Sequence, residues 1–387
     1  MTEMGTHEKV ALIAGVTGIV GNSLAAKLLQ EPKAPESSLW KVYGVARRSA
    51  KPDWLPESLH YIGCNLLDRE ETLSKLSRLQ DVTHLFYVTW VNRLTEEENI
   101  KTNTQLYRNI LDALLPNAKN FRHIVLQTGT KHYLGPFELA GQIPVPDPPF
   151  REDYPRRPCA NFYHDLEDMT FETVKGTSIT YSIHRPTGIF GFAEGNLMNM
   201  VSTLAVYAAI CQYENKPLIF PGSKMCWDFM QDASDADLVA EQEIWASLDP
   251  KAKNQDFNIT NGDVFKWKRL WQLLAKEYNV RAEYKNYESD HHQESELPKK
   301  TIPCKSLQEM MKGKEAVWDK IVKEKGLRPT KLADVAQWWF VDSWLGQDIE
   351  NVSNMNKSRE LGFLGWRDSE KSFLCVLEKS RKNRVVP

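Results

Sequence analysis

The chain has 387 residues, of which 42% are hydrophobic, so it can form one large domain or two of ordinary size around a real core. With 49 basic and 51 acidic residues, its formal net charge of -2 excludes binding to nucleic acid or an anionic membrane by bulk attraction. No apolar run reaches the ~18 residues that span a bilayer, and the first residues lack the pattern of a secretory signal. We therefore expect a cytoplasmic protein that acts on a small molecule.

The cysteine and histidine spacing does not indicate a disulfide framework or a metal site. The six cysteines lie far apart and form no Cys-x-x-Cys pair. His291 and His292 lie in the polar, unpatterned stretch 283–300, which we expect to be an exposed loop with both side chains solvated. The sequence therefore predicts no metal.

The first half of the chain alternates short apolar runs with helical patterns. We expect strands at 9–15, 40–46, 59–64, 82–89, 121–129 and 178–186. Between them, residues 99–115 carry apolar side chains at three- and four-residue spacing, which is typical of a helix. This order predicts an α/β fold with a Rossmann-type, doubly wound parallel sheet.

The pattern changes in the second half of the chain. Residues 133–160 are too rich in proline and glycine for regular structure, and long loops in compact domains are usually functional. Beyond them we expect helices at 197–215, 267–279 and 335–345, and a short strand and turn at 256–263. The chain therefore divides into a nucleotide-binding domain at 1–190 and a smaller, mainly helical substrate lobe at 191–387, of which some segments return to the first domain.

A glycine series follows the first strand. Gly15, Gly18 and Gly21 stand in a G-x-x-G-x-x-G spacing between a strand and a helix, as in the extended short-chain dehydrogenases. Glycines there let the backbone turn and approach a pyrophosphate, which the helix N-terminus then binds. We expect these glycines, with Thr17, Ile19 and Val20, to bind a dinucleotide.

The ends of the later strands indicate which dinucleotide binds. Where an NAD enzyme usually has an acidic residue, the second strand ends in Arg47 and Arg48, which suit a 2′-phosphate and favour NADPH/NADP+. Taken alone, the two arginines could equally be a solvated strand end. We place the adenine beside Asn65 and Leu66. The remaining cofactor contacts are expected from the ends of the fourth and fifth strands, at Thr89, Thr128 and Gly129.

The usual catalytic pair of a short-chain dehydrogenase is absent. Tyr163 is followed at the fourth position by Glu167, and none of the thirteen tyrosines has a lysine at that spacing. A phenol donates poorly to a developing oxyanion unless a cation lies near it. The best candidate for this cation is Lys131, just beyond the end of the fifth strand.

Several motifs along the chain resemble one family. "GVTGIVGNSLA", "LQTGTKHYLGPFE", "NFYHDLED", "SIHRPTGIFGF" and "KSRELGFLGWR" are similar to segments of the plant progesterone 5β-reductase and iridoid synthase family. The resemblance implies that Lys131 and Tyr163 are the catalytic pair, and that NADPH reduces the activated carbon–carbon double bond of an enone or enal. Progesterone-like steroids, small enones and 8-oxogeranial are the substrates that it implies.

The chemistry of such a reduction suits these residues. Hydride added to the β-carbon drives charge onto the carbonyl oxygen, where Tyr163 would donate a hydrogen bond and Lys131 would support it electrostatically. The apolar walls of the site are expected from Trp90, Phe137 and Phe340.

Two other functions stay open. A carbonyl reductase or nucleotide-sugar epimerase would use the same fold, although the missing Tyr-x-x-x-Lys pair argues against it. A redox sensor that binds NADPH without turnover would need neither Tyr163 nor Lys131. We interpret His164 as structural, because adjacent side chains on a helix point apart. A homodimer is possible.

Overall fold

A single parallel sheet forms one half of the molecule. The computed structural model describes residues 9–30, 40–139, 142–195, 198–284 and 306–387. Seven strands lie in the order β10-β6-β5-β4-β1-β2-β3, and every pair is parallel. Their bounds are β1 Val10–Ala14, β2 Lys41–Ala46, β3 His60–Gly63, β4 His84–Tyr87, β5 His123–Gln127, β6 Thr180–Pro186 and β10 Gln255–Ile259. The predicted doubly wound fold is confirmed.

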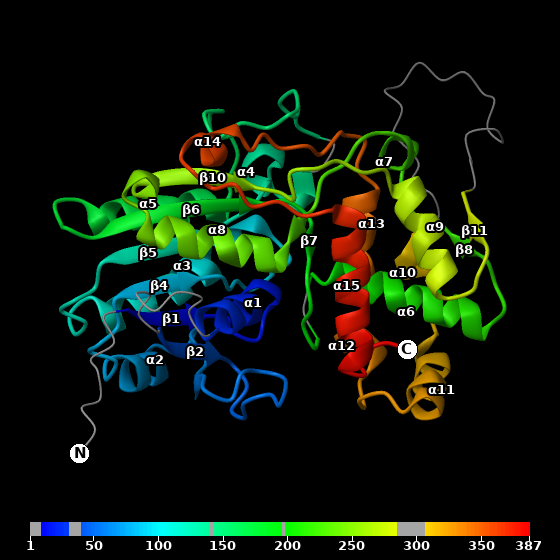
Figure 1. Cartoon of the computed structure of the whole chain (residues 1–387), viewed down its shortest axis with the longest axis horizontal. Coiled ribbons are helices and arrows are strands. Elements are labelled where there is room, and N and C mark those ends of the chain that lie inside the picture. Colours follow the sequence, from blue (N-terminus) through cyan, green and yellow to red (C-terminus); the bar gives the residue numbers. More distant parts are fainter. Residues whose placement is uncertain (1–8, 31–39, 140–141, 196–197, 285–305) are drawn as a thin grey trace.

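Helices cover both faces of this sheet (Figure 1). One layer holds α2 (Arg69–Leu76), α3 (Glu96–Leu114) and α5 (Phe162–Val174), and the other holds α1 (Ile19–Leu28) and α8 (Ala236–Leu248). Neighbouring strand residues belong to opposite cores: Leu12 packs into the core that contains α3 and α5, and Ile13 into the core that contains α1 and α8. Strands buried on both faces read as continuous apolar runs, which explains why the sequence revealed them.

The other half of the molecule is mainly helical, as Figure 1 shows. Its core contains the fully buried Trp267, Trp271 and Trp318. Its helices are α6 (Met200–Tyr213), α7 (Lys224–Asp228), α9 (Trp267–Glu277), α10 (Leu307–Met310), α11 (Glu315–Lys325), α12 (Leu332–Val335), α13 (Trp338–Leu345) and α15 (Ser369–Lys382). Two short strand pairs complete it, β8 (Leu218–Ile219) with β11 (Ala282–Glu283) and β7 (Ile189–Phe190) with β9 (Ser234–Asp235).

Several segments differ from the expected elements. The strand expected at 256–263 is β10, which pairs with β6 at the edge of the main sheet instead of lying in the lobe. The helix expected at 335–345 is two helices, because the backbone at Ala336 is extended and Gln337 donates its N–H to Thr203 at 3.0 Å. The domain boundary at residue 190 stays a prediction, although β10 and α8 come from beyond it.

The long proline-rich segment contains little regular structure. It begins with α4 (Lys131–Leu134) and the 3₁₀ turn η1 (Phe137–Leu139), and its described residues from 142 to the start of α5 form no further helix. A second 3₁₀ turn, η2 (Pro250–Ala252), follows α8, and α14 (Asn356–Glu360) lies near β10. Most of the expected exposed loop, with His291 and His292, lies outside the described residues.

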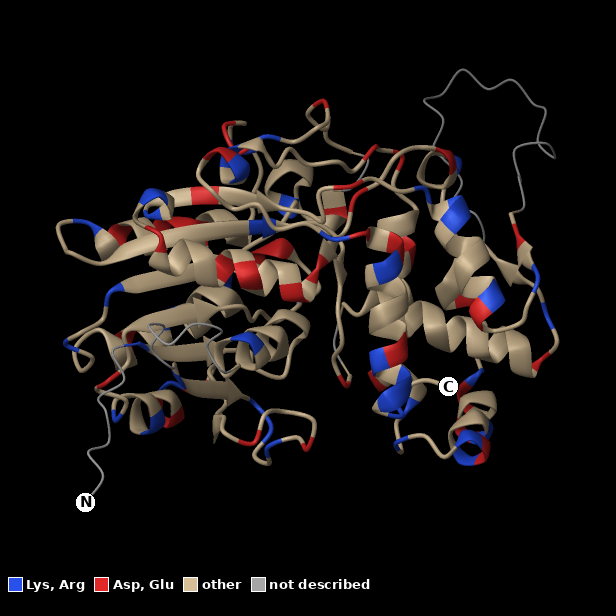
Figure 2. Ribbon diagram, viewed as in Figure 1, with Lys and Arg blue, Asp and Glu red and all other residues tan. Residues whose placement is uncertain are grey.

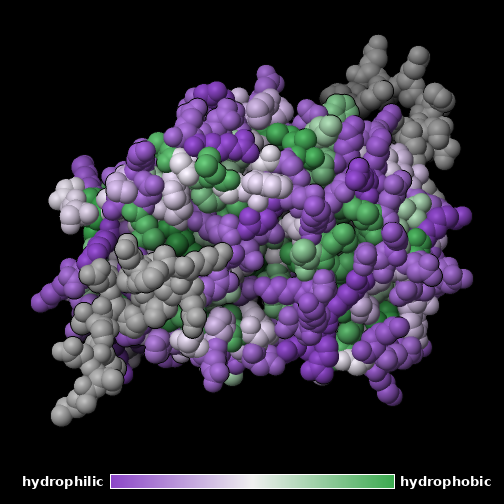
Figure 3. All heavy atoms as spheres, in the orientation of Figure 1, coloured by the Kyte–Doolittle hydropathy of each residue, from purple (hydrophilic) through white to green (hydrophobic). Residues whose placement is uncertain are grey.

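Charged residues of both signs are interspersed over the sheet half and the helical half (Figure 2). The face in Figure 3 is largely hydrophilic, with apolar groups in small areas between the charged side chains. Among the described residues, no helix combines the length and the apolar character that a bilayer crossing requires. The cytoplasmic location stays a prediction.

Candidate active site

The glycine loop after β1 has the geometry that close packing requires. Gly15 has a φ of +98°, in the left-handed region that favours glycine. A Cβ on Gly21 would lie 2.1 Å from the carbonyl oxygen of Gly15, so only glycine lets α1 approach the loop this closely. Gly18 is the N-cap of α1 and supplies no side-chain cap. The first N–H groups of α1 are therefore free to bind a phosphate.

One cavity of about 1760 Å³ runs from this loop along the carboxyl ends of the strands to the helical lobe. Nearly all of the residues predicted for the site line it. These are Gly15, Thr17, Gly18, Ile19, Val20, Arg47, Asn65, Leu66, Thr89, Trp90, Thr128, Gly129, Lys131, Phe137, Tyr163 and Phe340. Gly21 and Arg48 are not part of the lining.

The two arginines after β2 lie in different surroundings. Both side chains are exposed, but Arg47 borders the cavity whereas Arg48 contacts Glu194, with Nη1 3.5 Å from its Oε2 and Nη2 donating to its carbonyl oxygen at 3.2 Å. Asn65 is exposed, and its Oδ1 accepts a hydrogen bond from the N–H of Leu67 at 3.3 Å. Of the two arginines, Arg47 is therefore the better placed for a bound phosphate.

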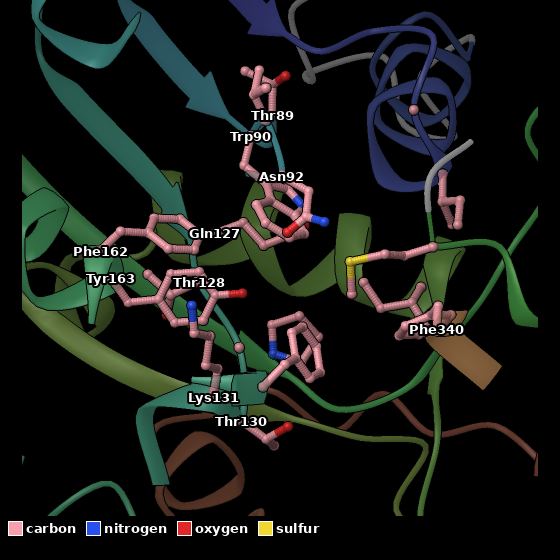
Figure 4. A pocket seen from close by; sticks show the side chains of 18 of the residues that line it. Thr89, Trp90, Asn92, Gln127, Thr128, Thr130, Lys131, Phe162, Tyr163 and Phe340 are labelled. Carbon is pink, nitrogen blue, oxygen red and sulfur yellow. The ribbon is translucent and has the colours of Figure 1, made fainter. Parts of the chain in front are cut away.

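Tyr163 and Lys131 come from different helices that meet at the end of β5. Asn161 is the N-cap of α5: its Oδ1 accepts from the N–H of Tyr163 at 3.1 Å, and its Nδ2 donates to the carbonyl oxygen of Lys131 at 3.0 Å. A Cβ on Gly129 would lie 3.3 Å from the Tyr163 hydroxyl, so this glycine leaves room for the ring. Figure 4 shows the Lys131 side chain extending toward Tyr163. The structure thus brings together two residues that are 32 positions apart.

The Lys131 ammonium is buried against aromatic rings and one carboxylate. Its Nζ lies 4.4 Å from the centroid of the Phe162 ring and 5.7 Å from that of the Tyr163 ring. It forms an ion pair of 2.6 Å with Oε2 of Glu96, and both side chains are buried. Within the described part of the chain, no hydrogen bond joins Lys131 Nζ to the Tyr163 hydroxyl. In this structure the lysine ammonium instead lies over the face of the tyrosine ring.

Burial shifts the pKa values of Tyr163 and Lys131 in opposite directions. It raises the pKa of the Tyr163 phenol above its usual range, and the negative charge of Glu96 raises that pKa further. Burial also lowers the pKa of Lys131, although the Glu96 carboxylate beside it opposes this shift. Tyr163 is therefore a protonated hydrogen-bond donor at neutral pH.

Glu167 occupies the position where the usual lysine would stand. It is buried and is held by Arg156 at 2.9 Å and Arg185 at 3.3 Å, with Nδ1 of His132 at 3.5 Å. Burial alone would raise the pKa of Glu167, but the nearby His132 ring and the charges of Arg185 and Arg156 lower it to about 2. Glu167 is thus an ionised anchor for α5 that faces cations, so a lysine could not be accommodated at this position.

His164, on the same helix, lies against His132, with ring centroids 5.3 Å apart. Burial lowers the pKa of His164 to about 4, so the ring is neutral at pH 7. It does not line the cavity.

The aromatic walls come from both halves of the molecule. Trp90 stacks on Phe162 with centroids 5.4 Å apart and an angle of 16° between the rings. Phe137 meets Trp339 edge-on at 6.0 Å, and Phe340 is buried at the other side of the cavity (Figure 4).

Sequence reasoning missed several residues of the site. Glu96 and Phe162 contact Lys131, and Gln127 and Thr187 line the cavity with a side-chain oxygen that is buried and unpartnered. Gln127 could have been predicted from the sequence, because it directly precedes Thr128 at the end of the fifth strand. Glu96 looks no different in the sequence from the acidic residues that follow it.

Comparison with known proteins identifies close relatives over nearly the whole chain. The family described as PRISE-like Rossmann-fold domain matches residues 11–387. The (S)-8-oxocitronellyl enol synthase of Catharanthus roseus is 49% identical over 384 residues, which cover 99% of this chain and 93% of that protein. The 3-oxo-Delta(4,5)-steroid 5-beta-reductase of Arabidopsis thaliana is 51% identical over 387 residues, covering 99% and 94%. The resemblance that the motifs predicted is confirmed.

Solved structures with similar folds are more distant. A UDP-glucose 4-epimerase from Thermotoga maritima superposes with a TM-score of 0.64 at 15% identity, covering 96% of this chain and 99% of that one. The Bordetella bronchiseptica enzyme WbmH in complex with NAD+ gives a TM-score of 0.60 at 14% identity, covering 97% and 99%. These likenesses support the fold alone.

Proposed function

Because the chain belongs to the PRISE-like Rossmann-fold family, we propose that it is an NADPH-dependent reductase that adds hydride to the activated carbon–carbon double bond of enones or enals. The names of its relatives support this chemistry, since one is a 3-oxo-Delta(4,5)-steroid 5-beta-reductase and another an (S)-8-oxocitronellyl enol synthase. The observation that carries the proposal is the protonated Tyr163, which lines the cavity with the Lys131 ammonium 5.7 Å from its ring.

The residues of the cavity fit a dinucleotide. The uncapped N-terminus of α1 lies at the cavity beside the glycine loop, where its N–H groups can bind a pyrophosphate. A side chain at Gly21 would prevent the close packing of α1 against this loop. When bound, the reduced nicotinamide supplies the hydride. Arg47 borders the cavity with an exposed side chain, which supports a 2′-phosphate and hence NADPH. Asn65 and Leu66 stay the proposed adenine contacts.

The protein contributes an oxyanion donor. As hydride reaches the β-carbon, the electron pair of the double bond shifts toward the carbonyl, and negative charge builds on its oxygen. Tyr163 donates a hydrogen bond to that oxygen, and the Lys131 cation stabilises the same charge through space. A proton from the solvent then reaches the α-carbon to complete the reduction. Removing one such donor typically costs a factor of about 10²–10³ in rate.

The substrate walls would be Trp90, Phe137 and Phe340. All three line the same cavity as Tyr163, and Figure 4 shows Trp90 and Phe340 at different sides of it. Progesterone and 8-oxogeranial both carry a carbonyl-activated double bond on a mainly hydrocarbon skeleton with a second carbonyl group, so either fits this chemistry.

The experiment is NADPH oxidation with progesterone and with 8-oxogeranial side by side, with the products identified. A 5β-pregnane product assigns a steroid reductase, and a preference for 8-oxogeranial with bicyclic products assigns an iridoid-forming enzyme. Activity on small enones alone leaves a general enone reductase. NADPH binding without turnover of any enone would refute the proposal and favour a redox sensor.

Tyr163→Phe tests the assigned donor. We expect a rate lower by about 10²–10³ with NADPH binding retained. The matched control is Tyr213→Phe on the exposed end of α6, which should leave the rate unchanged. A Tyr163→Phe protein that reduces enones at the full rate would remove Tyr163 from the mechanism.

A further inference from the structure

Glu96 is the first residue of α3 and has an unusual position for an acidic residue at a helix start. Three acidic residues follow Thr95, yet Glu96 is buried whereas Glu97 and Glu98 are exposed. An unpaired buried carboxylate is costly, so such a residue needs partners that satisfy both oxygens.

The partners of Glu96 come from three helices. Oε2 binds Lys131 Nζ of α4 at 2.6 Å and accepts from Asn99 Nδ2 of α3 at 3.2 Å. Oε1 accepts from the N–H of Phe162, the first residue of α5, at 2.7 Å. One carboxylate therefore connects the proposed catalytic lysine to the helix turn that carries the proposed catalytic tyrosine.

We propose that Glu96 is a positioning residue for the reduction, which fixes the Lys131 ammonium beside the Tyr163 ring and ties it to the first turn of α5. The inference rests on the proposed function, since it concerns the same pair of residues. Glu96 does not line the cavity, so it acts through Lys131 and α5 and not by contact with substrate.

The charges around Lys131 support this role. Glu96 contacts it from α3, while Glu138 of η1 and Cys159 of the segment before α5 act on it at longer range. Tyr163 faces it from α5. Burial lowers the pKa of Lys131, and Glu96 is the largest opposing influence among these groups. Without the carboxylate, the lysine would lose its proton at lower pH.

The same carboxylate acts on the tyrosine. Burial raises the pKa of Tyr163, and the charge of Glu96 raises it further. Removing that charge would therefore lower the pH at which either group loses its proton. Because the reaction needs a phenol that donates and a lysine that is charged, activity would decline earlier on the alkaline side.

The test is the pH dependence of kcat in Glu96→Gln. The amide still offers an oxygen to the Phe162 N–H, so the variant removes the charge with little change of shape. We expect the alkaline limb to move to lower pH by about 1–3 units, the effect of one nearby opposite charge, with NADPH binding unchanged. Glu97→Gln, which removes an exposed neighbouring charge, should reproduce the wild-type profile.

A purely structural role predicts a different result. If Glu96→Gln lowers kcat by one factor at every pH, or leaves the profile unchanged, the proposal is overturned. Glu96→Asp covers the case in which the glutamine variant does not fold. It keeps the charge on a shorter side chain, so we expect a reduced kcat on the wild-type pH profile, and a shifted alkaline limb would contradict the proposal.

A second readout does not depend on enone turnover. Phenolate absorbance can be titrated in the wild type and in Glu96→Gln, with Tyr163→Phe identifying the signal of Tyr163. We expect that signal to titrate at lower pH in Glu96→Gln. If no enone is reduced but this shift occurs, the proposed function fails while the coupling stands. If enones are reduced and the shift is absent, Glu96 does not control the pair.

Discussion

Glu167→Lys would create a Tyr-x-x-x-Lys sequence on α5, and we expect it to damage the fold instead of supplying a second catalytic cation. The site at 167 is buried and holds Arg156 at 2.9 Å and Arg185 at 3.3 Å. Removing one partner of a buried ion pair costs about 3–5 kcal/mol, and a lysine adds repulsion to that loss. Since domains are stable by about 5–15 kcal/mol, this is a large share of the total.

The assay is urea unfolding followed by tryptophan fluorescence. With a slope of about 3 kcal/mol per molar urea, a loss of 3–5 kcal/mol lowers the midpoint by about 1–2 M. Glu167→Gln should show a loss of this size and Glu167→Lys a larger one. Glu172→Lys, on the exposed side of the same helix, should stay within about 0.5 kcal/mol of the wild type. A Glu167→Lys protein of wild-type stability that keeps its activity when Lys131 is replaced by Met would refute this reasoning.

Three further predictions concern the cofactor, the substrate and acid stability. Arg47→Ala should raise the KM for NADPH by about 10–100-fold with little change for NADH, as steady-state kinetics would show, because a charge-assisted contact contributes about 1.5–3 kcal/mol. Arg48→Ala should have a smaller effect, since Arg48 pairs with Glu194. Phe340→Ala should change the ratio of kcat/KM between large and small enones, whereas an equal loss for all of them would indicate core damage. Burial lowers the pKa of His184 to about 4, below the unfolded value of about 6.5, so its stabilising contribution is complete above pH 6.5 and is lost as the pH falls toward 4. The loss of stability at pH 5 is about 2 kcal/mol. Urea midpoints at pH 7 and pH 5 would measure it, and we expect His184→Gln to reduce the difference between the two midpoints.

The sheet was readable from the sequence because its strands are buried on both faces. Each of the six predicted strands overlaps one of β1 to β6, and the interior strand Val10–Ala14 is an uninterrupted, fully buried apolar run. Strand β10 was expected in the lobe because it lies beyond residue 190, and no local pattern says which sheet edge a strand joins. The helix expected at 335–345 is interrupted at Gln337 by a tertiary hydrogen bond to Thr203, which periodicity cannot reveal.

For the site, nearly all of the residues predicted from local patterns line the cavity, but most of its lining and most of its contacts were not predicted. The glycine loop and the strand ends have fixed places in a doubly wound sheet, so residues such as Gly15 and Thr128 could be placed from their spacing. Arg47 and Arg48 are adjacent residues of the same type, so the sequence alone does not show that Arg48 pairs with Glu194. Glu96 could not be singled out from Glu97 in the same way, because the two differ in burial and not in residue type.

The distance between tyrosine and lysine is controlled differently here than in a Tyr-x-x-x-Lys enzyme. Four-residue spacing places both side chains on one face of one helix, so helix geometry alone fixes their separation. In this chain Lys131 begins α4 and Tyr163 lies in α5, so tertiary contacts must fix that separation. Asn161 joins the two backbones, and Glu96 joins the ammonium to the first turn of α5. Because the lysine is not on α5, position 167 can hold Glu167, which anchors α5 to Arg185 of β6. The separation of Lys131 and Tyr163 then depends on Glu96, a buried acid from a third helix.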